Sequence, residues 1–126
     1  MKEEIIKIII PLNPVTKKNS SRIVKRGNGY MLLPSKAYVN YEKACYPYLV
    51  QHKYNIKAPI NVEAIYYRAT KHRVDLCNLH EALCDVLAHY KVIEDDNSDI
   101  ISTMDGSRVE YDKEFPRTEI TITPKK

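Results

Sequence analysis

The feature that most constrains this chain is an amphipathic segment at residues 79–90 with acidic residues gathered at each end. Its apolar side chains recur every three or four positions, which is the spacing of one face of an α-helix. Asn78 and Glu81 stand at the first and last positions of a capping box, so Asn78 is the predicted N-cap. Such a helix must bury its apolar face against another element, usually a sheet or a second helix.

Four segments rich in β-branched residues predict strands. They span residues 4–10, 60–68, 100–104 and 117–123. The first is an almost continuous apolar run, which is typical of a strand covered on both faces. The Gly-Asn-Gly at 27–29 predicts a hairpin between short strands near 21–25 and 30–33, and Asp105-Gly106-Ser107 predicts a turn that joins the last two of the four strands.

A further helix is predicted from Lys36, because Ser35 is a favourable N-cap. Pro47 has no amide hydrogen for the helical ladder, so it should kink or divide this helix. Together the elements predict an α/β (α+β) fold, with one mixed sheet and two main helices in a single domain over residues 1–126.

Composition narrows the class of protein. A hydrophobic content of 44% and a charged content of 29% are ordinary for a globular domain, so disorder is not expected. No apolar run approaches the ~20 residues of a membrane-spanning helix, and no membrane partner is expected. The three cysteines are odd in number and follow no secretory leader, which predicts a reducing, cytoplasmic location.

The acidic residues at the two ends of the helix are candidate metal ligands. Hard cations such as Mg²⁺ prefer carboxylate and water oxygens, and Asp75, Asp95 and Asp96 supply three carboxylates. In phosphodiester hydrolysis such an ion activates water and neutralises charge at phosphorus. Two simpler interpretations stay open: Asp75 helps to cap the helix, and residues 94–97 form a solvated turn.

Geometry limits how these carboxylates can meet. A helix of about twelve residues spans ~18 Å, so Asp75 and Asp96 start at opposite ends of it. Either the segment after the helix doubles back along it, or a second subunit completes the site. We expect the second arrangement, a homodimer.

A zinc site is a less favoured alternative. Cys77, His80 and Cys84 would face one way if the helix began before residue 79, and sulfur and imidazole are zinc ligands. A fourth ligand is missing from this spacing, and a buried free cysteine is the commoner fate of such a residue.

The stretch from Arg73 to Ile100 resembles the signature of the RusA-type Holliday-junction resolvases. That family has an Asp-x-Asp-Asn motif, a helix containing Asp-Ala-Leu, and an Asp-Asp pair that leads into a strand. This chain reads Asp-Leu-Cys-Asn at 75–78, Asp-Val-Leu at 85–87 and Asp-Asp at 95–96. Residues 14–19, Pro-Val-Thr-Lys-Lys-Asn, follow the first strand as in the family.

The resemblance implies a RusA-like fold and a small homodimeric endonuclease of prophage or phage origin, located in the cytoplasm of a bacterial or phage-infected cell. Such enzymes use Mg²⁺, with Mn²⁺ as an alternative, to nick four-way DNA junctions in DNA recombination and repair. Asp75 and Asn78 match the first motif, and Asp95 and Asp96 match the Asp pair, with Asp96 the stronger candidate ligand. Asp85 matches the helix aspartate, whose role we interpret as structural.

Two positions depart from the family pattern. Cys77 stands where the second motif aspartate should be, and a thiol is a poor ligand for Mg²⁺. Glu81 stands where the family usually has a catalytic lysine. Glu81 either supplies the lost carboxylate or serves as the last residue of the capping box. Three cations could replace the lost lysine: Lys71, Arg73 and Lys91.

The net charge of +4 permits a phosphate-rich partner. Seven basic residues are candidates for contacts with the DNA backbone: Lys17, Lys18, Arg22, Lys25, Arg26, Lys71 and Arg73. The leading hypothesis is therefore a metal-dependent endonuclease for branched DNA. The rivals are a junction-binding protein that lost catalysis through Cys77 and Glu81, and a phage protein that binds a host protein.

Overall fold

The structure is a computed structural model, and it describes residues 4–17, 22–33 and 35–125. Its body is a mixed sheet with the strand order β1-β7-β4-β5, in which β6 also pairs with β4. The strands of this sheet are β1 Ile6–Ile10, β4 Ile60–Arg68, β5 Ile101–Thr103, β6 Arg108–Tyr111 and β7 Arg117–Pro124. β7 runs antiparallel to β1 and β4, whereas β5 and β6 run parallel to β4, one near each of its ends.

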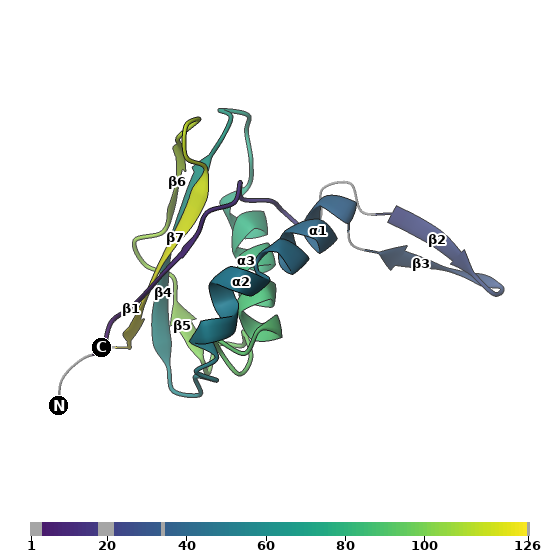
Figure 1. The fold of residues 1–126 in the computed structure, drawn as a ribbon. Coiled ribbons are helices and arrows are strands. Elements are labelled where there is room, and N and C mark those ends of the chain that lie inside the picture. Colours follow the sequence, from purple (N-terminus) through teal and green to yellow (C-terminus); the bar gives the residue numbers. More distant parts are fainter. Residues whose placement is uncertain (1–3, 18–21, 34, 126) are drawn as a thin grey trace.

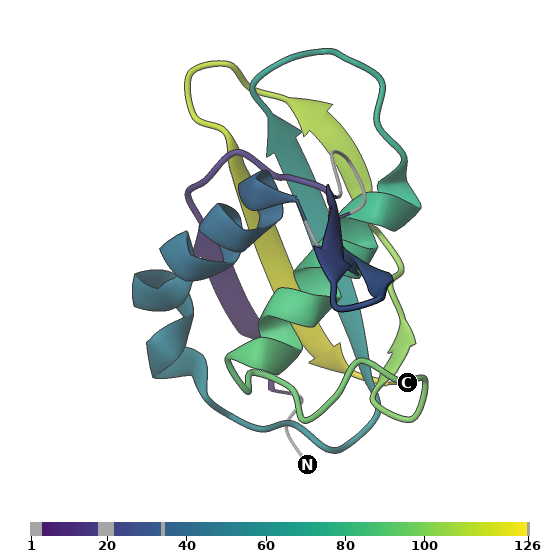
Figure 2. The same ribbon diagram turned by 90° about the vertical axis from the view of Figure 1, so that its right-hand side faces the viewer.

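The helices lie together on one face of this sheet, as Figure 1 and the turned view in Figure 2 show. They are α1 Lys36–Ala44, α2 Tyr46–Leu49 and α3 Leu76–His89, and a 3₁₀ turn η1, Val50–His52, follows α2. α3 forms the crossover between the parallel strands β4 and β5. The α+β architecture with one mixed sheet confirms the expected fold class.

The core lies between this face of the sheet and the helices. Burial alternates along β4, where Ile60, Val62, Ala64 and Tyr66 are buried and their neighbours are partly exposed. α3 contributes its apolar stripe, and the side chain of Leu87 is fully buried. The period-two burial of the strands therefore meets the helical stripe of α3, as the sequence predicts.

The first helix begins and ends as predicted. Ser35 is the N-cap of α1, and its Oγ accepts a hydrogen bond from the backbone N–H of Tyr38 at 3.1 Å. α1 ends at Ala44, and Pro47 lies in the first turn of α2, where its missing amide hydrogen leaves no ladder bond unmade. The prediction that Pro47 divides the helix is confirmed.

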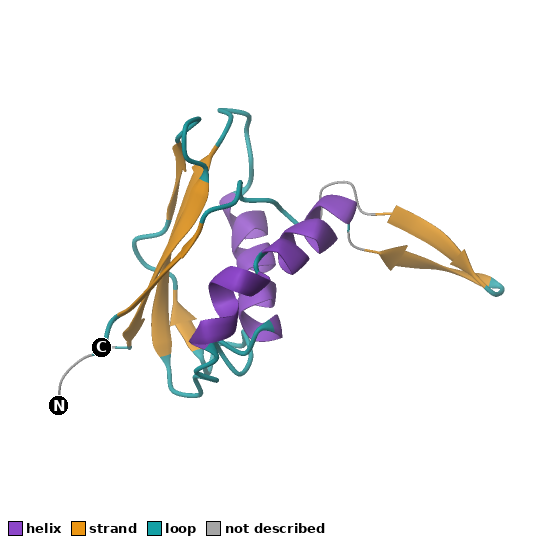
Figure 3. Ribbon diagram, viewed as in Figure 1, coloured by secondary structure: helices purple, strands orange, loops and turns teal. Residues whose placement is uncertain are grey.

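The hairpin at 27–29 is also confirmed. β2 Arg22–Arg26 pairs antiparallel with β3 Gly29–Leu33, and Gly27 adopts φ 57° at the turn. The two strands form their own sheet, separate from the body, and they project away from it (Figures 1 and 3).

The prediction that the first strand is covered on both faces is wrong. Ile8 and Ile10 point into the core, but Ile5 and Ile9 are 58% and 52% exposed. The described helices cover one face of the sheet, so the apolar residues that alternate with Ile8 and Ile10 lie on the uncovered face.

The predicted direct turn between the last two strands is also wrong. A strand, β6, lies between them and pairs parallel with Ile65–Arg68 of β4. All four of its residues are exposed, so β6 lacks the alternating apolar pattern that marks a half-buried strand.

The predicted start of the central helix needs correction. α3 begins at Leu76, and its N-cap is Asp75, whose carbonyl accepts the N–H groups of Asn78 at 3.1 Å and Leu79 at 3.2 Å. Asn78 therefore lies inside the first turn, and the capping box of Asn78 and Glu81 is wrong. Glu81 consequently lies in the body of the helix.

No helix in the described part of the chain is long and apolar enough to cross a membrane.

Candidate active site

A broad hollow of about 420 Å³ opens to solvent between α3 and β5. One wall is a single face of α3. The four residues of this helix that line the hollow are spaced three, one and three positions apart, which places them on the same side of the helix. The other wall is β5 with the residue that follows it. The lining residues are Cys77, His80, Glu81, Cys84, Asp96, Ile101, Ser102, Thr103 and Met104. The hollow thus brings Asp96, from the acidic segment after α3, next to one face of that helix.

Asp96 reaches this hollow because the chain turns sharply after α3. Lys91 takes a left-handed conformation with φ 60°, and its carbonyl accepts the N–H of Asn55 at 2.8 Å. Val92 and Ile93 are fully buried, and Ile93 forms a parallel bridge with Ile56. These contacts hold the returning segment in place. The segment after α3 therefore doubles back along the helix within one chain and brings Asp96, but not Asp75, to the hollow.

The two aspartates of the pair have different surroundings. The Asp95 carboxylate accepts the N–H of Asp96 at 2.8 Å and the side-chain amide of Asn97 at 3.1 Å, so it stabilises a local turn. Those hydrogen bonds lower the pKa of Asp95. Asp96 instead lines the hollow. Partial burial raises the pKa of Asp96, and the Asp95 and Asp85 carboxyl groups add to this effect.

Asp85, next to Cys84 in α3, forms an ion pair with Lys17. Its Oδ2 lies 2.6 Å from Nζ of Lys17, in the loop after β1, and both side chains are about one-third exposed. The hydrogen bond with Asp85 raises the pKa of Lys17, with smaller electrostatic contributions from Glu81 and Glu42. Nζ of Lys17 also lies 5.6 Å from the centre of the Tyr38 ring. Lys17 thus places a cation beside the acidic face of α3, a role the sequence did not reveal.

His80 and Cys84 are held in neutral forms. Nδ1 of His80 lies 2.6 Å from the hydroxyl of the buried Tyr66, and burial lowers the pKa of His80. Burial raises the pKa of the Cys84 thiol to about 12, with help from the Asp96 and Asp85 charges. Soft metals bind thiolates, so a thiol with this pKa is a weak ligand near neutral pH.

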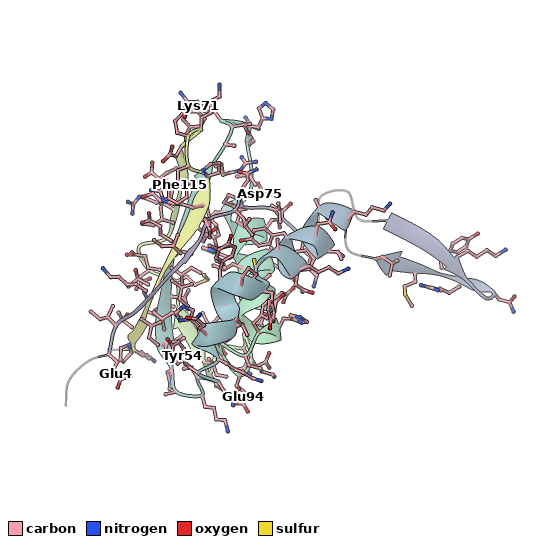
Figure 4. All side chains as sticks on the ribbon, viewed as in Figure 1. Glu4, Tyr54, Lys71, Asp75, Glu94 and Phe115 are labelled. Carbon is pink, nitrogen blue, oxygen red and sulfur yellow. The ribbon has the colours of Figure 1, made fainter. Side chains whose placement is uncertain are left out.

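Asp75 and Asn78 lie at the N-terminal end of α3, and Asp75 is labelled there in Figure 4. The Asp75 carboxylate makes no capping hydrogen bond, although Nδ2 of Asn78 lies 3.5 Å from its Oδ2. Asp75 is exposed and is not among the residues that line the hollow. Figure 4 shows Glu94 at the opposite end of α3 from Asp75. From Glu94 the chain continues through Asp95 to Asp96, which lines the hollow.

The side chains around the hollow can be compared as ligands for the candidate metals. Among them, no group of three His, Cys, Asp or Glu side chains is placed to hold a metal ion. Cys77, His80 and Cys84 do line one hollow, as expected for a helix that starts early. Mg²⁺ is often held by one or two carboxylates with waters and substrate phosphates. The Glu81 and Asp96 carboxylates therefore suit Mg²⁺ or Mn²⁺, whereas the protonated thiol of Cys84 is a weak ligand for zinc.

The candidate DNA-contacting residues are spread over three places. Lys25 and Arg26 are exposed near the tip of the β2–β3 hairpin. Lys71 and Arg73 are exposed in the loop between β4 and α3, where Nζ of Lys71 lies 4.9 Å from the Tyr111 ring centre. Lys17 is paired with Asp85. Lys18 and the side chain of Arg22 lie outside the described residues.

Comparison with known proteins gives one family match. The sequence model of the family described as Endodeoxyribonuclease RusA matches residues 11–123. The matched range includes Lys17, the whole of α3, Asp96 and β5, so it contains every residue of the hollow. No curated protein matches the chain.

Proposed function

The chain belongs to the endodeoxyribonuclease RusA family, and from this membership we propose that it is a metal-dependent endonuclease that nicks four-way DNA junctions. The observation that best supports this proposal is the position of Asp96. Its carboxylate lies in the hollow that Glu81 also lines, although the two residues are separated by the second half of α3 and the returning segment.

Glu81 and Asp96 are the proposed metal ligands in the hollow. Glu81 lies within the helix and so does not have the capping role that the sequence suggested. It shares the hollow with Cys77, four residues earlier and one helical turn away, so its carboxylate compensates for the one missing from the Asp-x-Asp-Asn motif. We propose that two more carboxylates contribute to metal binding: Asp75, at the N-terminal end of α3, and Asp95, in the turn next to Asp96.

The surroundings of Asp96 fit a cation. Partial burial and the neighbouring carboxylates disfavour the charged form of Asp96, so a cation bound in the hollow would stabilise that charge. A bound Mg²⁺ or Mn²⁺ would neutralise charge on the scissile phosphate and lower the pKa of an attacking water. The protein's own contribution is to hold the carboxylates in place, with Lys17 balancing the Asp85 charge beside them.

A second candidate function follows from Cys77. This residue lines the hollow and offers a thiol where the family motif has a carboxylate. A protein with the same fold could therefore bind junctions without cutting them. For the nuclease we propose a homodimer, because symmetric nicking of a four-way junction needs two sites.

A cleavage assay separates these functions. A labelled synthetic four-way junction and a duplex of the same sequence are incubated with the protein and Mg²⁺, Mn²⁺ or EDTA. The nuclease proposal expects nicks in the junction with either metal and none with EDTA. Junction binding without nicking under both metals would establish the second function, and sedimentation velocity would show whether the active species is a dimer.

A further inference from the structure

β2 and β3 form a two-stranded ribbon, which we call the arm, and the residues of its tip are exposed. Its strands pair with each other and with no other described strand, and they project from the body (Figures 1 and 3). An isolated two-stranded hairpin is marginally stable in water. The arm therefore has the structure of an element that gains stability from a partner surface.

Charge identifies the kind of partner. From Ile5 to Tyr41 the sequence has seven lysines and arginines and no aspartate or glutamate. This stretch therefore carries a net charge of +7, while the whole chain carries +4, so the remainder carries −3. Two copies of such an arm repel each other, whereas a polyanion attracts it. The charge separation favours nucleic acid as the partner.

The tip of the arm presents cations and exposed apolar groups together. Lys25 lies directly opposite Tyr30 in the register, so their side chains share one face of the ribbon. Tyr30 is 77% exposed. Arg26 and Met31 fall on the other face by the same alternation, and Met31 is 47% exposed. Both faces near the tip therefore offer a cation to phosphate and an apolar side chain to a groove.

The base of the arm lies beside the candidate active site. On one side of the arm, Lys17 is bound to Asp85 of α3. On the other side, Ser35 caps α1 through the N–H of Tyr38, and Lys17 lies over the Tyr38 ring. DNA held by the arm would therefore pass near the face of α3 that lines the hollow.

We propose that the arm docks in the major groove of a DNA duplex, with Lys25 and Arg26 on the phosphates and Tyr30 within the groove. A two-stranded ribbon fits the major groove, which is about 12 Å wide. Five-residue strands extend about 17 Å, enough to carry the tip well beyond the body. This inference rests on the proposed function for the identity of the substrate, but docking to a duplex needs neither a junction nor a metal.

The test measures binding without catalysis. Fluorescence anisotropy of a labelled unbranched duplex in EDTA, at several salt concentrations, is compared for the full chain and the double variant K25Q/R26Q. Losing two phosphate contacts should lower the magnitude of the slope of log K against log salt by about 1.8. The matched control is K53Q/K57Q, which removes two exposed cations near Tyr54, on the body away from the arm (Figure 4). The control should leave the slope nearly unchanged.

Tyr30 and the groove are tested separately. Tyr30→Ala should weaken duplex binding severalfold at an unchanged salt slope, and Tyr30→Phe should bind nearly normally. Methylation of guanine N7, which lies in the major groove, should weaken duplex binding by the native protein more than binding by Tyr30→Ala. Equal effects of the arm and control variants, or a loss of dimer on sedimentation of K25Q/R26Q, would overturn the proposal. A chain that binds duplex through its arm yet nicks no junction would overturn the nuclease function alone.

Discussion

Nζ of Lys17 lies 2.6 Å from Oδ2 of Asp85, so an ion pair joins the loop after β1 to α3 across 68 positions of sequence. The pair sets the charge beside the hollow, because Asp85 also acts on the Asp96 carboxyl group. It also fixes the strand-to-arm connection against the helix that carries Glu81. One contact thus links the loop that leads to the arm, the helix and the candidate metal ligand.

The first prediction concerns the strength of this ion pair. The two side chains are 36% and 29% exposed, so solvent screens the attraction only in part. A double-mutant cycle with K17M, D85N and the double variant should give a coupling energy of about 0.5–1 kcal/mol in the free energy of unfolding by urea. The coupling should fall in 1 M NaCl. Additive single-variant effects at low salt would show that the pair contributes nothing.

The second prediction separates the two members of the Asp pair. Asp96→Asn should reduce junction nicking by more than about 100-fold, since even residues that act on a metal through a ligand change activity about 10–100-fold. Junction binding in EDTA should be preserved. Asp95→Asn is the matched control and should reduce nicking much less, because the Asp95 carboxylate is used in the turn. Equal losses in the two variants would place the metal between them rather than in the hollow.

The third prediction restores the family motif. Cys77 is exposed at the second position of α3, so an aspartate there fits sterically and interacts favourably with the helix dipole by about 0.3–1 kcal/mol. Cys77→Asp should lower the Mg²⁺ concentration for half-maximal nicking by about tenfold, because an added carboxylate raises the ligand charge. Cys77→Ser removes the sulfur without adding charge and should behave like the native protein. Matching Mg²⁺ titrations for all three proteins would exclude Cys77 from the metal environment.

The fourth prediction concerns pH. Arg117 and the N–H groups of Phe115 and Glu114 bind the Asp112 carboxylate and lower its pKa. A carboxyl group whose pKa is lowered by folding stabilises the protein above its unfolded pKa, and that contribution is lost as the pH falls below about 4 through the folded value. Asp112→Asn should therefore destabilise the protein at pH 7, with a difference that shrinks in acid. A difference in the urea midpoint that stays constant from pH 7 to pH 3 would contradict this explanation, and Glu94→Gln serves as the control.

Local patterns predicted much of the fold. The N-cap at Ser35, the break at Pro47 and the strand at 60–68 follow from rules that act within a few residues, and the structure confirms them. β6 was not predicted because all of its side chains are exposed, so its sequence has no alternating apolar pattern. Its position also depends on pairing with β4, which is distant in the sequence. The start of α3 was misplaced because Asp75 acts as N-cap through its carbonyl, which the capping-box pattern does not detect.

The candidate site was predicted as a set of residues but not as an arrangement. Asp96 and Glu81 were both identified from the motif, yet their approach depends on how Asn55 and Ile56 bind the segment after α3. Those contacts join residues about 36 positions apart, and no local spacing encodes them. The pairing of Lys17 with Asp85 is more distant still, so the sequence indicated a DNA contact for Lys17 and missed its intramolecular partner.

β4, α3 and β5 form a parallel crossover, so the hollow between α3 and β5 can form only after β5 has been translated. Parallel pairing brings together segments that are distant in sequence, so it forms after the intervening chain has been made. Because the wall opposite α3 is Ile101–Met104, a nascent chain that ends before this segment can carry the arm and α3 but not both walls of the hollow. On the ribosome, the surface proposed to hold DNA would thus emerge before the surface proposed to cut it.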